Sequence, residues 1–471
     1  MTKTKIVATF GPATEDPSTI KKIMTEGISC ARINLSHGTK SSHRDLISNL
    51  QRIREDLEVP LSIIADTKGP EVRLKPAGGG EVVLKEGEEV RLVTESVNQG
   101  RTFIVDFPNI GSLLSEGNVV IIGDGDLSLS VESIEEGVVE CRALSSGSVS
   151  GNTKVTVPGV SFPLPPITEE DKEDIKFAVS EGVDWLALSF VKDEGAIHEA
   201  REIVEKTSAD DIPIIAKIET VEAVENINAI AREADGLMVA RGDLAMAIGM
   251  EEVPFLQKRL IRLANNQAIP VITATQMLET MMNAPTPTRA EITDVANAVL
   301  DGTDALMLSG ETAIGSYPIK TVNTMRKLAE KADANFSPGD NLEILPDGKT
   351  DRTAPEIGRA ACSMADRLGA KAIITSTRSG YTGRLVARFR PRVPIIAVTP
   401  SEDVYHQLAL VWGIKPIQVE TTRDTDQMIE KSIRSVKEEG YLEEGDLVVV
   451  TAGVPFAVKG TTNLIKVEQV S

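Results

Sequence analysis

A lysine and two acidic residues lie close together in the middle of the chain, next to two runs that predict buried strands. Lys217 and Glu219 stand at the end of the apolar run 212–218, and Asp243 follows the next run, 236–240. Because alternate residues of a strand face the same side, Lys217 and Glu219 should project together. Two carboxylates suit Mg²⁺ or Mn²⁺, and a neighbouring lysine can neutralise a transferring phosphoryl group. The pattern therefore predicts a metal-dependent phosphoryl-transfer site.

Polar and charged residues also follow several of the other apolar runs. A lone Lys-x-Glu pair is more often a structural ion pair, but similar side chains recur at five strand ends, which favours an active site. The chain has four histidines, so a zinc site built from histidine is not indicated, and we expect His43, His198 and His406 to be solvated or capping residues. The strand-end residues are Arg32, Asn34, Ser36 and His37; Asp66, Thr67, Lys68, Glu71 and Arg73; Arg241 and Gly242; Thr275; and Glu311.

The elements that must position these residues alternate between short apolar runs and helical patterns. Asp16 before Pro17, for example, marks a helix start, and Gly27 marks its end. Eight such β/α units predict a TIM-type (β/α)8 barrel, in which functional residues belong at the C-terminal ends of the strands. The predicted strands are residues 5–9, 28–35, 61–66, 185–189, 212–218, 236–240, 269–274 and 305–308.

Two further segments interrupt and follow this barrel. Residues 72–157 contain short alternating strands without a convincing helix, which predicts an inserted all-β lid. Residues 338–352 are rich in Pro, Gly and Asp, and strands at 371–374, 393–398 and 447–450 then predict a separate α/β domain. We therefore expect a barrel domain at 1–70 and 159–337, a β-barrel-like lid domain at 71–158, and a C-terminal α/β domain at 350–471.

Composition excludes several classes of protein. The formal net charge of −20 argues against a nucleic-acid partner, because binding to a phosphate backbone requires a basic face. No apolar run approaches transmembrane length, and the run 6–10 is too short for a signal sequence, so no membrane association is expected. Cys30, Cys141 and Cys362 are odd in number and far apart, so we expect no disulfide framework and a cytoplasmic location.

Several longer stretches resemble the pyruvate kinase family, and the resemblance runs nearly from end to end. The stretches are TKIVATFGPAT, ARINLSHG, ADTKGPEVR, IIAKIE, MVARGDLA, TATQMLETM, PTRAEITDVANAVLDGTDALMLSGETAIGSYP and VARFRPRVPIIAVTP. The resemblance implies transfer of the phosphoryl group of phosphoenolpyruvate to ADP, giving ATP and pyruvate, the last step of glycolysis. It also implies a homotetramer.

The resemblance assigns roles to the residues at the strand ends. Lys217 would contact the transferring phosphoryl group, and Glu219 with Asp243 would bind the divalent metal, Mg²⁺ or Mn²⁺. Arg32 would hold the phosphate of phosphoenolpyruvate. The remaining substrate contacts would be the amides of Gly242 and Asp243 together with Thr275, which would hold the carboxylate near the path of the proton to the enolate.

The resemblance also assigns binding residues to a second, monovalent cation and to the nucleotide. Glu71 stands where potassium-dependent members of the family carry an acid, so we expect dependence on K⁺. Lys154 takes the place of the lid's nucleotide lysine, although the usual lysine pair is missing there. The other expected ligands are Asn34, Ser36, Asp66 and Thr67 for the monovalent cation, and His37 and Arg73 for the nucleotide.

One loop of the C-terminal segment could bind the phosphate of a sugar-phosphate or nucleotide effector through hydroxyl groups and helix amides. An ordinary helix cap is an equally good interpretation of this loop. The loop residues are Ser376, Thr377, Arg378, Ser379, Gly380 and Thr382.

Two alternatives for the function of the whole chain are a metal-dependent barrel lyase or aldolase acting on oxo-acids, and a regulatory binding protein without turnover.

Overall fold

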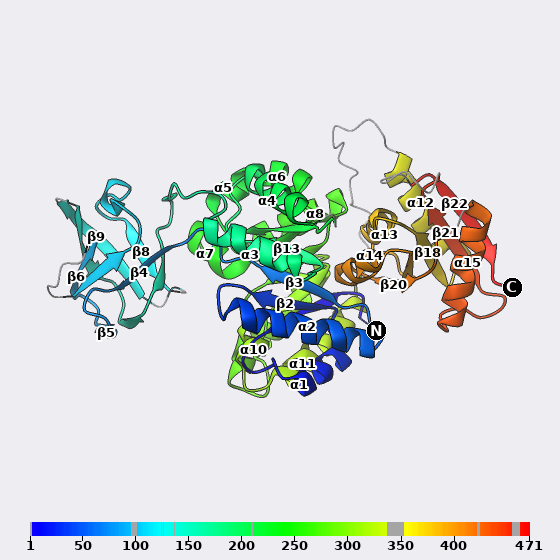
Figure 1. Cartoon of the computed structure of the whole chain (residues 1–471), viewed down its shortest axis with the longest axis horizontal. Helices are drawn as coiled ribbons and strands as arrows, with labels where there is room; N and C mark the ends of the chain where they lie inside the picture. Colours follow the sequence, from blue (N-terminus) through cyan, green and yellow to red (C-terminus); the bar gives the residue numbers. More distant parts are fainter. Residues whose placement is uncertain are drawn as a thin grey trace.

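The computed structural model describes residues 2–95, 101–123, 125, 127–135, 137–208, 211–336, 353–421, 424–454 and 462–471. Figure 1 shows three bodies in a row, with a small β domain at one end, a β/α barrel in the centre and an α/β domain at the other end. The expected domain limits remain our proposal, and the limits at 337 and 350 lie outside the described residues.

Eight parallel strands close the central barrel in the order β1-β17-β16-β15-β14-β13-β3-β2. All eight predicted strands are present, so the predicted TIM-type barrel is confirmed. Their bounds are β1 (Lys5–Phe10), β2 (Cys30–Asn34), β3 (Ser62–Asp66), β13 (Trp185–Leu188), β14 (Ile214–Ile218), β15 (Gly236–Ala240), β16 (Val271–Ala274) and β17 (Ala305–Leu308).

Helices surround these strands and begin at residues that cap them. Asp16 accepts hydrogen bonds from the first amides of α1, with Pro17 as the first helical residue, as predicted. Thr168 and Thr288 form capping boxes that start α3 and α9. The helices of the barrel are α1 (Pro17–Thr25), α2 (Lys40–Asp56), α3 (Glu169–Ser180), α4 (Glu194–Thr207), α5 (Val221–Glu225), α6 (Ile227–Glu233), α7 (Arg241–Ile248), α8 (Val253–Gln267), η2 (Glu279–Met282), α9 (Arg289–Leu300), α10 (Gly310–Ala313) and α11 (Pro318–Asp333).

The interior of the barrel is a packed layer of apolar side chains. Cys30, Ile64 and Ile215 belong to this layer, and each is fully buried. Since strand side chains alternate, the residue two positions after each of these also faces inward, nearer the C-terminal rim. The geometry thus carries Arg32, Asp66 and Lys217 onto one rim.

The inserted segment forms a second, smaller closed barrel in the strand order β10-β6-β7-β4-β12-β8-β9, beside a two-stranded sheet of β11 and β5. This architecture confirms the predicted all-β insertion. Its elements are β4 (Val72–Pro76), β5 (Glu81–Leu84), β6 (Glu89–Val93), β7 (Thr102–Val105), η1 (Ile110–Ser112), β8 (Val119–Ile122), β9 (Leu127–Glu135), β10 (Val138–Ala143), β11 (Gly147–Ser150) and β12 (Thr153–Thr156).

The C-terminal body is a five-stranded sheet in the order β20-β19-β18-β21-β22, flanked by helices. The sequence predicted its three central strands and missed β20 and β22. These two strands form the edges of the sheet and carry exposed residues, so they lack a continuous apolar run. The elements are α12 (Thr353–Leu368), β18 (Ala372–Ser376), α13 (Tyr381–Ala387), β19 (Ile395–Thr399), α14 (Glu402–Gln407), η3 (Leu408–Leu410), β20 (Ile414–Gln418), α15 (Thr425–Glu438), β21 (Leu447–Ala452) and β22 (Leu464–Gln469).

The C-terminal domain packs on the base of the barrel. Leu410 of η3 is fully buried and joins the apolar layer inside the barrel. Arg390 is also buried, and its guanidinium group pairs with Asp304 at 2.9 Å. Our expectation for the histidines was wrong for His43 and His406, which are buried, because helical patterns do not show what packs on a helix.

Candidate active site

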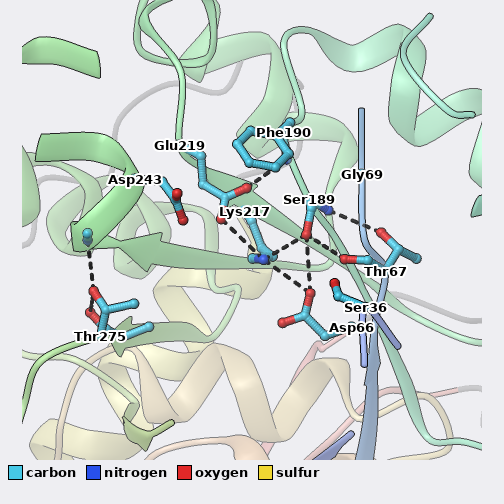
Figure 2. Close-up of polar contacts among 12 residues, drawn as sticks. Ser36, Asp66, Thr67, Gly69, Ser189, Phe190, Lys217, Glu219, Asp243 and Thr275 are labelled. Carbon is cyan, nitrogen blue, oxygen red and sulfur yellow. Dashed lines mark hydrogen bonds and ion pairs between the residues drawn. The ribbon is translucent and has the colours of Figure 1, made fainter. Parts of the chain in front are cut away.

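Lys217 lies at the centre of a buried ionic cluster on the C-terminal rim of the barrel (Figure 2). Its Nζ atom is 3.1 Å from Asp66 Oδ1 and 3.1 Å from Glu219 Oε1. Arg32 joins the cluster from β2, with its Nε atom 2.6 Å from Asp66 Oδ2. The structure therefore brings together four predicted site residues, and they come from three different strands.

The charges of this cluster set the protonation of its members. Burial alone would lower the pKa of Lys217, but Asp66 and Glu219 outweigh burial and raise it. Burial alone would raise the pKa of Asp66, but Arg32 and Lys217 hold it below its ordinary value. Both groups are thus charged at neutral pH, and Lys217 presents a fixed positive charge to the rim.

Glu219 and Asp243 form the pair of carboxylates that the sequence predicted. Asp243 lies in the first turn of α7, and its carboxyl group interacts with that of Glu219. Burial, reinforced by the charge of Asp243, raises the pKa of Glu219 to about 7, although Lys217 opposes this effect. Burial alone would also raise the pKa of Asp243, but Lys154 outweighs burial and lowers it.

This pair fits a divalent cation. Two adjacent, largely buried carboxylates repel each other, and a hard cation with oxygen ligands relieves that repulsion. Among the described residues no group of three or more His, Cys, Asp or Glu side chains could hold a metal ion. Two carboxylates with the remaining positions left for water and substrate match the way in which proteins usually bind Mg²⁺.

The residues after β13 belong to the site, and the sequence analysis missed them. Ser189 Oγ accepts a hydrogen bond from Lys217 Nζ at 2.7 Å, and the Phe190 amide donates to Glu219 Oε2 at 2.7 Å (Figure 2). Ala187, two residues before Ser189, belongs to the apolar layer inside the barrel. The alternation that placed Lys217 on the rim would therefore have placed Ser189 there as well.

Thr275 and Gly242 meet at the ends of β16 and β15. The Gly242 amide donates to Thr275 Oγ1 at 2.9 Å. Thr275 has a left-handed backbone, with φ 66°. Arg241 holds this backbone in place, since its guanidinium group donates to the Thr275 carbonyl oxygen at 2.6 Å and pairs with Asp294 at 2.7 Å. The strained turn therefore presents the Thr275 hydroxyl group beside the N-terminus of α7.

The four expected ligands of the monovalent cation lie on neighbouring strand ends, because β2 pairs with β3 in a register that sets Asn34 opposite Asp66. Asn34 Oδ1 accepts from the Ser36 amide at 3.2 Å. Thr67 is buried, and its carbonyl oxygen accepts from Ser189 Oγ at 2.6 Å. His37 has an exposed side chain, and its carbonyl oxygen accepts from His43 at 2.6 Å.

The lid contributes a cationic side chain to the site. Lys154 of β12 forms an ion pair with Asp243, and its Nζ atom lies 4.5 Å from the centre of the Phe190 ring. Glu71 is 3.8 Å from Lys154 and 2.5 Å from Arg73. Glu71, Lys154, Phe190 and Asp243 border a cavity of about 240 Å³ between the lid and the barrel. Lys154 therefore faces the cleft, whereas Arg73 does not line it, and each of the two already has a carboxylate partner.

The loop considered for an effector lies in the C-terminal domain, away from this rim. Ser376, Thr377 and Thr382 are buried, and the Thr382 hydroxyl group bonds that of Thr462 at 2.9 Å. Arg378 is exposed and Ser379 is partly exposed. Of the predicted loop residues with polar side chains, these two are the ones open to a ligand in this conformation.

Comparison with known families shows the family to which this chain belongs. The family described as "Pyruvate kinase, barrel domain" matches residues 1–322, and the family "Pyruvate kinase, alpha/beta domain" matches residues 356–468. The chain belongs to the pyruvate kinase family. It is therefore a phosphotransferase, and neither the lyase or aldolase alternative nor the regulatory protein without turnover is favoured.

Individual members of the pyruvate kinase family match along the whole chain. The pyruvate kinase of Clostridium acetobutylicum is 41% identical over 472 residues, which cover 100% of both chains. That of Geobacillus stearothermophilus is 42% identical and covers 100% of this chain and 80% of the relative. A crystal structure of a pyruvate kinase from Cryptosporidium parvum superposes with a TM-score of 0.92 at 34% identity, covering 100% of this chain and 96% of the other.

None of the helices in the described part of this pyruvate kinase family member combines the length and apolar character that a membrane crossing requires. The three cysteines, Cys30, Cys141 and Cys362, are free thiols. Burial raises the pKa of Cys30 and of Cys141 to about 12, which disfavours the thiolate form through which cysteines react.

Proposed function

We propose that this chain transfers the phosphoryl group of phosphoenolpyruvate to ADP on the rim formed by Lys217, Glu219 and Asp243. One observation carries the proposal: a permanently charged lysine is held between Asp66 and Glu219, beside a second carboxylate, at the C-terminal end of a β/α barrel. The P–O bond to the enol oxygen breaks, a bond from phosphorus to the terminal oxygen of ADP forms, and protonation of the enolate gives pyruvate.

Lys217 and Arg32 supply the positive charge that this transfer needs. Phosphoryl transfer depends mainly on positioning and on charge stabilisation, and both side chains are fixed by Asp66 before substrate arrives. Lys217 would face the moving phosphoryl group, and Arg32 the phosphate as bound in the substrate. Their burial strengthens these interactions, because little water screens them.

Glu219 and Asp243 are the proposed ligands of the divalent metal, Mg²⁺ or Mn²⁺. When bound, the metal would polarise phosphoryl oxygens as a Lewis acid. The chain itself orients the two ligands, since the Phe190 amide holds Glu219 and the first turn of α7 carries Asp243.

Gly242, Asp243 and Thr275 are the proposed contacts of the substrate carboxylate. The N-terminus of α7 presents backbone amides, which favour an anion. The Thr275 hydroxyl group donates to the Ala274 carbonyl oxygen at 2.7 Å, and it can turn toward the path of the proton to the enolate.

A second cation and the nucleotide complete the proposal. We assign the monovalent cation, K⁺, to the oxygen atoms of Asn34, Ser36, Asp66 and Thr67. Glu71 is the acidic residue from which we infer that the activity depends on K⁺. We assign ADP to His37 and Arg73, with Lys154 reaching it from the lid. Closure of the lid would exclude water, which otherwise competes with ADP as acceptor.

Three further proposals concern the location, the oligomeric state and the regulation of the whole protein. The three free cysteines are compatible with a reducing compartment such as the cytoplasm. A homotetramer follows from family resemblance, and size-exclusion chromatography with light scattering would test it. A phosphorylated effector at Ser376 to Thr382 would have to be recognised first by Arg378 and Ser379, so Arg378→Ala should abolish any activation by sugar phosphates.

The central experiment follows pyruvate formation from phosphoenolpyruvate with ADP, Mg²⁺ and K⁺, and omits each component in turn. We expect each omission to stop or strongly lower turnover, and Lys217→Met to lower kcat by about 10²- to 10³-fold. Lys192→Met is a control, because Lys192 borders the cavity between the lid and the barrel but donates to the Phe162 carbonyl oxygen. Pyruvate made without ADP, or full activity in Lys217→Met, would refute the proposal. Full activity without K⁺ would refute only the proposed dependence on K⁺, that is, the assignment of the cation site and of Glu71.

A further inference from the structure

Ser189 and Phe190, directly after β13, contact several groups of the rim. We propose that Ser189 is a positioning residue: its hydroxyl group holds the Lys217 ammonium group in line and ties it to the backbone of the Asp66–Thr67 segment. This inference rests on the proposed function, because it gives Lys217 the role assigned above.

The hydroxyl group of Ser189 has a single proton, and its direction is fixed. Ser189 Oγ donates that proton to the Thr67 carbonyl oxygen at 2.6 Å, in preference to Asp66 Oδ1, which lies farther away at 3.3 Å. Only lone pairs of Oγ then remain for Lys217 Nζ, which donates to Oγ at 2.7 Å. Ser189 is 5% exposed, so water hardly competes for either bond. The Lys217 contact is therefore a charge-assisted hydrogen bond in a dry environment.

Three neighbours share the three protons of the Lys217 ammonium group: Asp66 and Glu219, each at 3.1 Å, and Ser189 at 2.7 Å. If Glu219 bound the divalent metal as proposed, one of these protons would become free to face the phosphoryl group. Asp66 and Ser189 would still accept hydrogen bonds from the other two N–H groups, and these two bonds would fix the direction of the third N–H group. A flexible lysine stem held by Asp66 alone could swing about that single contact.

The segment that carries Ser189 is itself rigid. Phe190 has φ 54°, an unfavourable conformation for an aromatic residue, and its amide donates to Glu219 at 2.7 Å. Gly69 packs so tightly on this turn that a Cβ atom there would lie 2.6 Å from Ser189 Cβ. Thr67 Oγ1 accepts from the Ser189 amide at 3.3 Å. Packing and hydrogen bonds thus fix Ser189 well enough for it to position another side chain.

The first part of the test uses steady-state kinetics of the full chain. Ser189→Ala should lower kcat by about 10- to 100-fold, as expected for loss of a hydrogen bond to a charged group. The KM for phosphoenolpyruvate should change by less than about threefold, because the ammonium group remains present but poorly directed. Ser189→Thr keeps the hydroxyl group and should recover most of the lost kcat. An unchanged kcat in Ser189→Ala, or a loss that appears only in KM, would overturn the proposal.

The second part does not depend on activity. Melting temperatures of Ser189→Ala, Lys217→Met and the double variant form a double-mutant cycle. Removing the Ser189 hydroxyl group should cost clearly less stability when Lys217 is already Met, and strictly additive changes would contradict the contact. If the chain makes no pyruvate but the cycle is non-additive, the proposed function fails while the Ser189–Lys217 pairing stands. If the chain is active but the cycle is additive, the proposed function stands and the pairing fails.

Discussion

Lys154 of the lid pairs with Asp243 of the barrel, and so one carboxylate of the proposed metal pair is already neutralised by the chain itself. The Lys154 side chain is 16% exposed, and the Phe190 ring lies beneath its ammonium group at 4.5 Å. A divalent ion at Glu219 and Asp243 would experience repulsion from this ammonium group, so lid position and metal binding should be linked.

Lys154→Met should therefore strengthen metal binding in the absence of substrate. We expect the Mn²⁺ dissociation constant, followed by electron paramagnetic resonance, to fall several-fold, because a competing positive charge is removed. Lys192→Met is the control, since Lys192 borders the same cavity without contacting Asp243, and it should change this constant by less than about twofold. Weaker Mn²⁺ binding in Lys154→Met would show that the lysine does not oppose the metal.

Gly69→Ala should damage the active site through the turn after β13. The added Cβ atom would lie 2.6 Å from Ser189 Cβ and 2.8 Å from the Phe190 ring, so the turn must move. Displacement of catalytic groups by roughly 1 Å can lower kcat by about 10²-fold. Gly79→Ala provides the control, because Gly79 has a similar φ of 70° and no neighbour within 4 Å of the added atom. Equal kcat values for the two variants would contradict this explanation.

His406 should make the protein less stable in acid. Burial, helped by the charge of Arg54, lowers its pKa to about 3, while the unfolded chain has the ordinary value of 6.5. Between these two pH values the unfolded state binds a proton that the folded state does not. The free energy of unfolding therefore has its full value above pH 6.5 and decreases as the pH falls below 6.5. Asp184 acts in the opposite direction, because burial raises its pKa to about 6. Its contribution to the free energy of unfolding therefore decreases as the pH rises toward 6.

His406→Gln isolates the contribution of the histidine. From pH 6.5 to pH 5 the wild type should lose about 2 kcal/mol more than the variant, measured from urea unfolding midpoints. Asp184 is present in both proteins, so its effect is removed by subtraction. Parallel stability profiles would mean that His406 is protonated in the folded chain.

Arg390→Met should loosen the junction between the barrel and the C-terminal domain. The guanidinium group bonds Asp304, the Asn265 side chain at 2.6 Å and the Gly302 carbonyl oxygen at 2.8 Å. Its loss removes the ion-pair partner of the buried Asp304 carboxylate, which typically costs about 3–5 kcal/mol. Arg392→Met changes an exposed arginine two residues away and should be nearly neutral. Thermal unfolding of both variants would distinguish these expectations.

Local geometry determined what the sequence could predict. The eight barrel strands were recognised because each is a short apolar run, and the pairing of Lys217 with Glu219 followed because residues two apart on a strand share a face. The same rule extends to Ser189, which stands two residues after the inward-facing Ala187 of β13. Helix starts such as Asp16 before Pro17 were predictable for a similar reason, since a cap depends on its own first turn.

Tertiary structure decided the contacts between residues far apart in the chain. Arg32, Asp66 and Lys217 meet because barrel closure sets β2, β3 and β14 around one axis, and no short-range pattern specifies those partners. The burial of His406 and the neutralisation of Asp243 by Lys154 depend on how separate domains dock. The sequence by itself thus determined which residues could do chemistry, and packing over long distances decided which charges face each other and how each one is protonated.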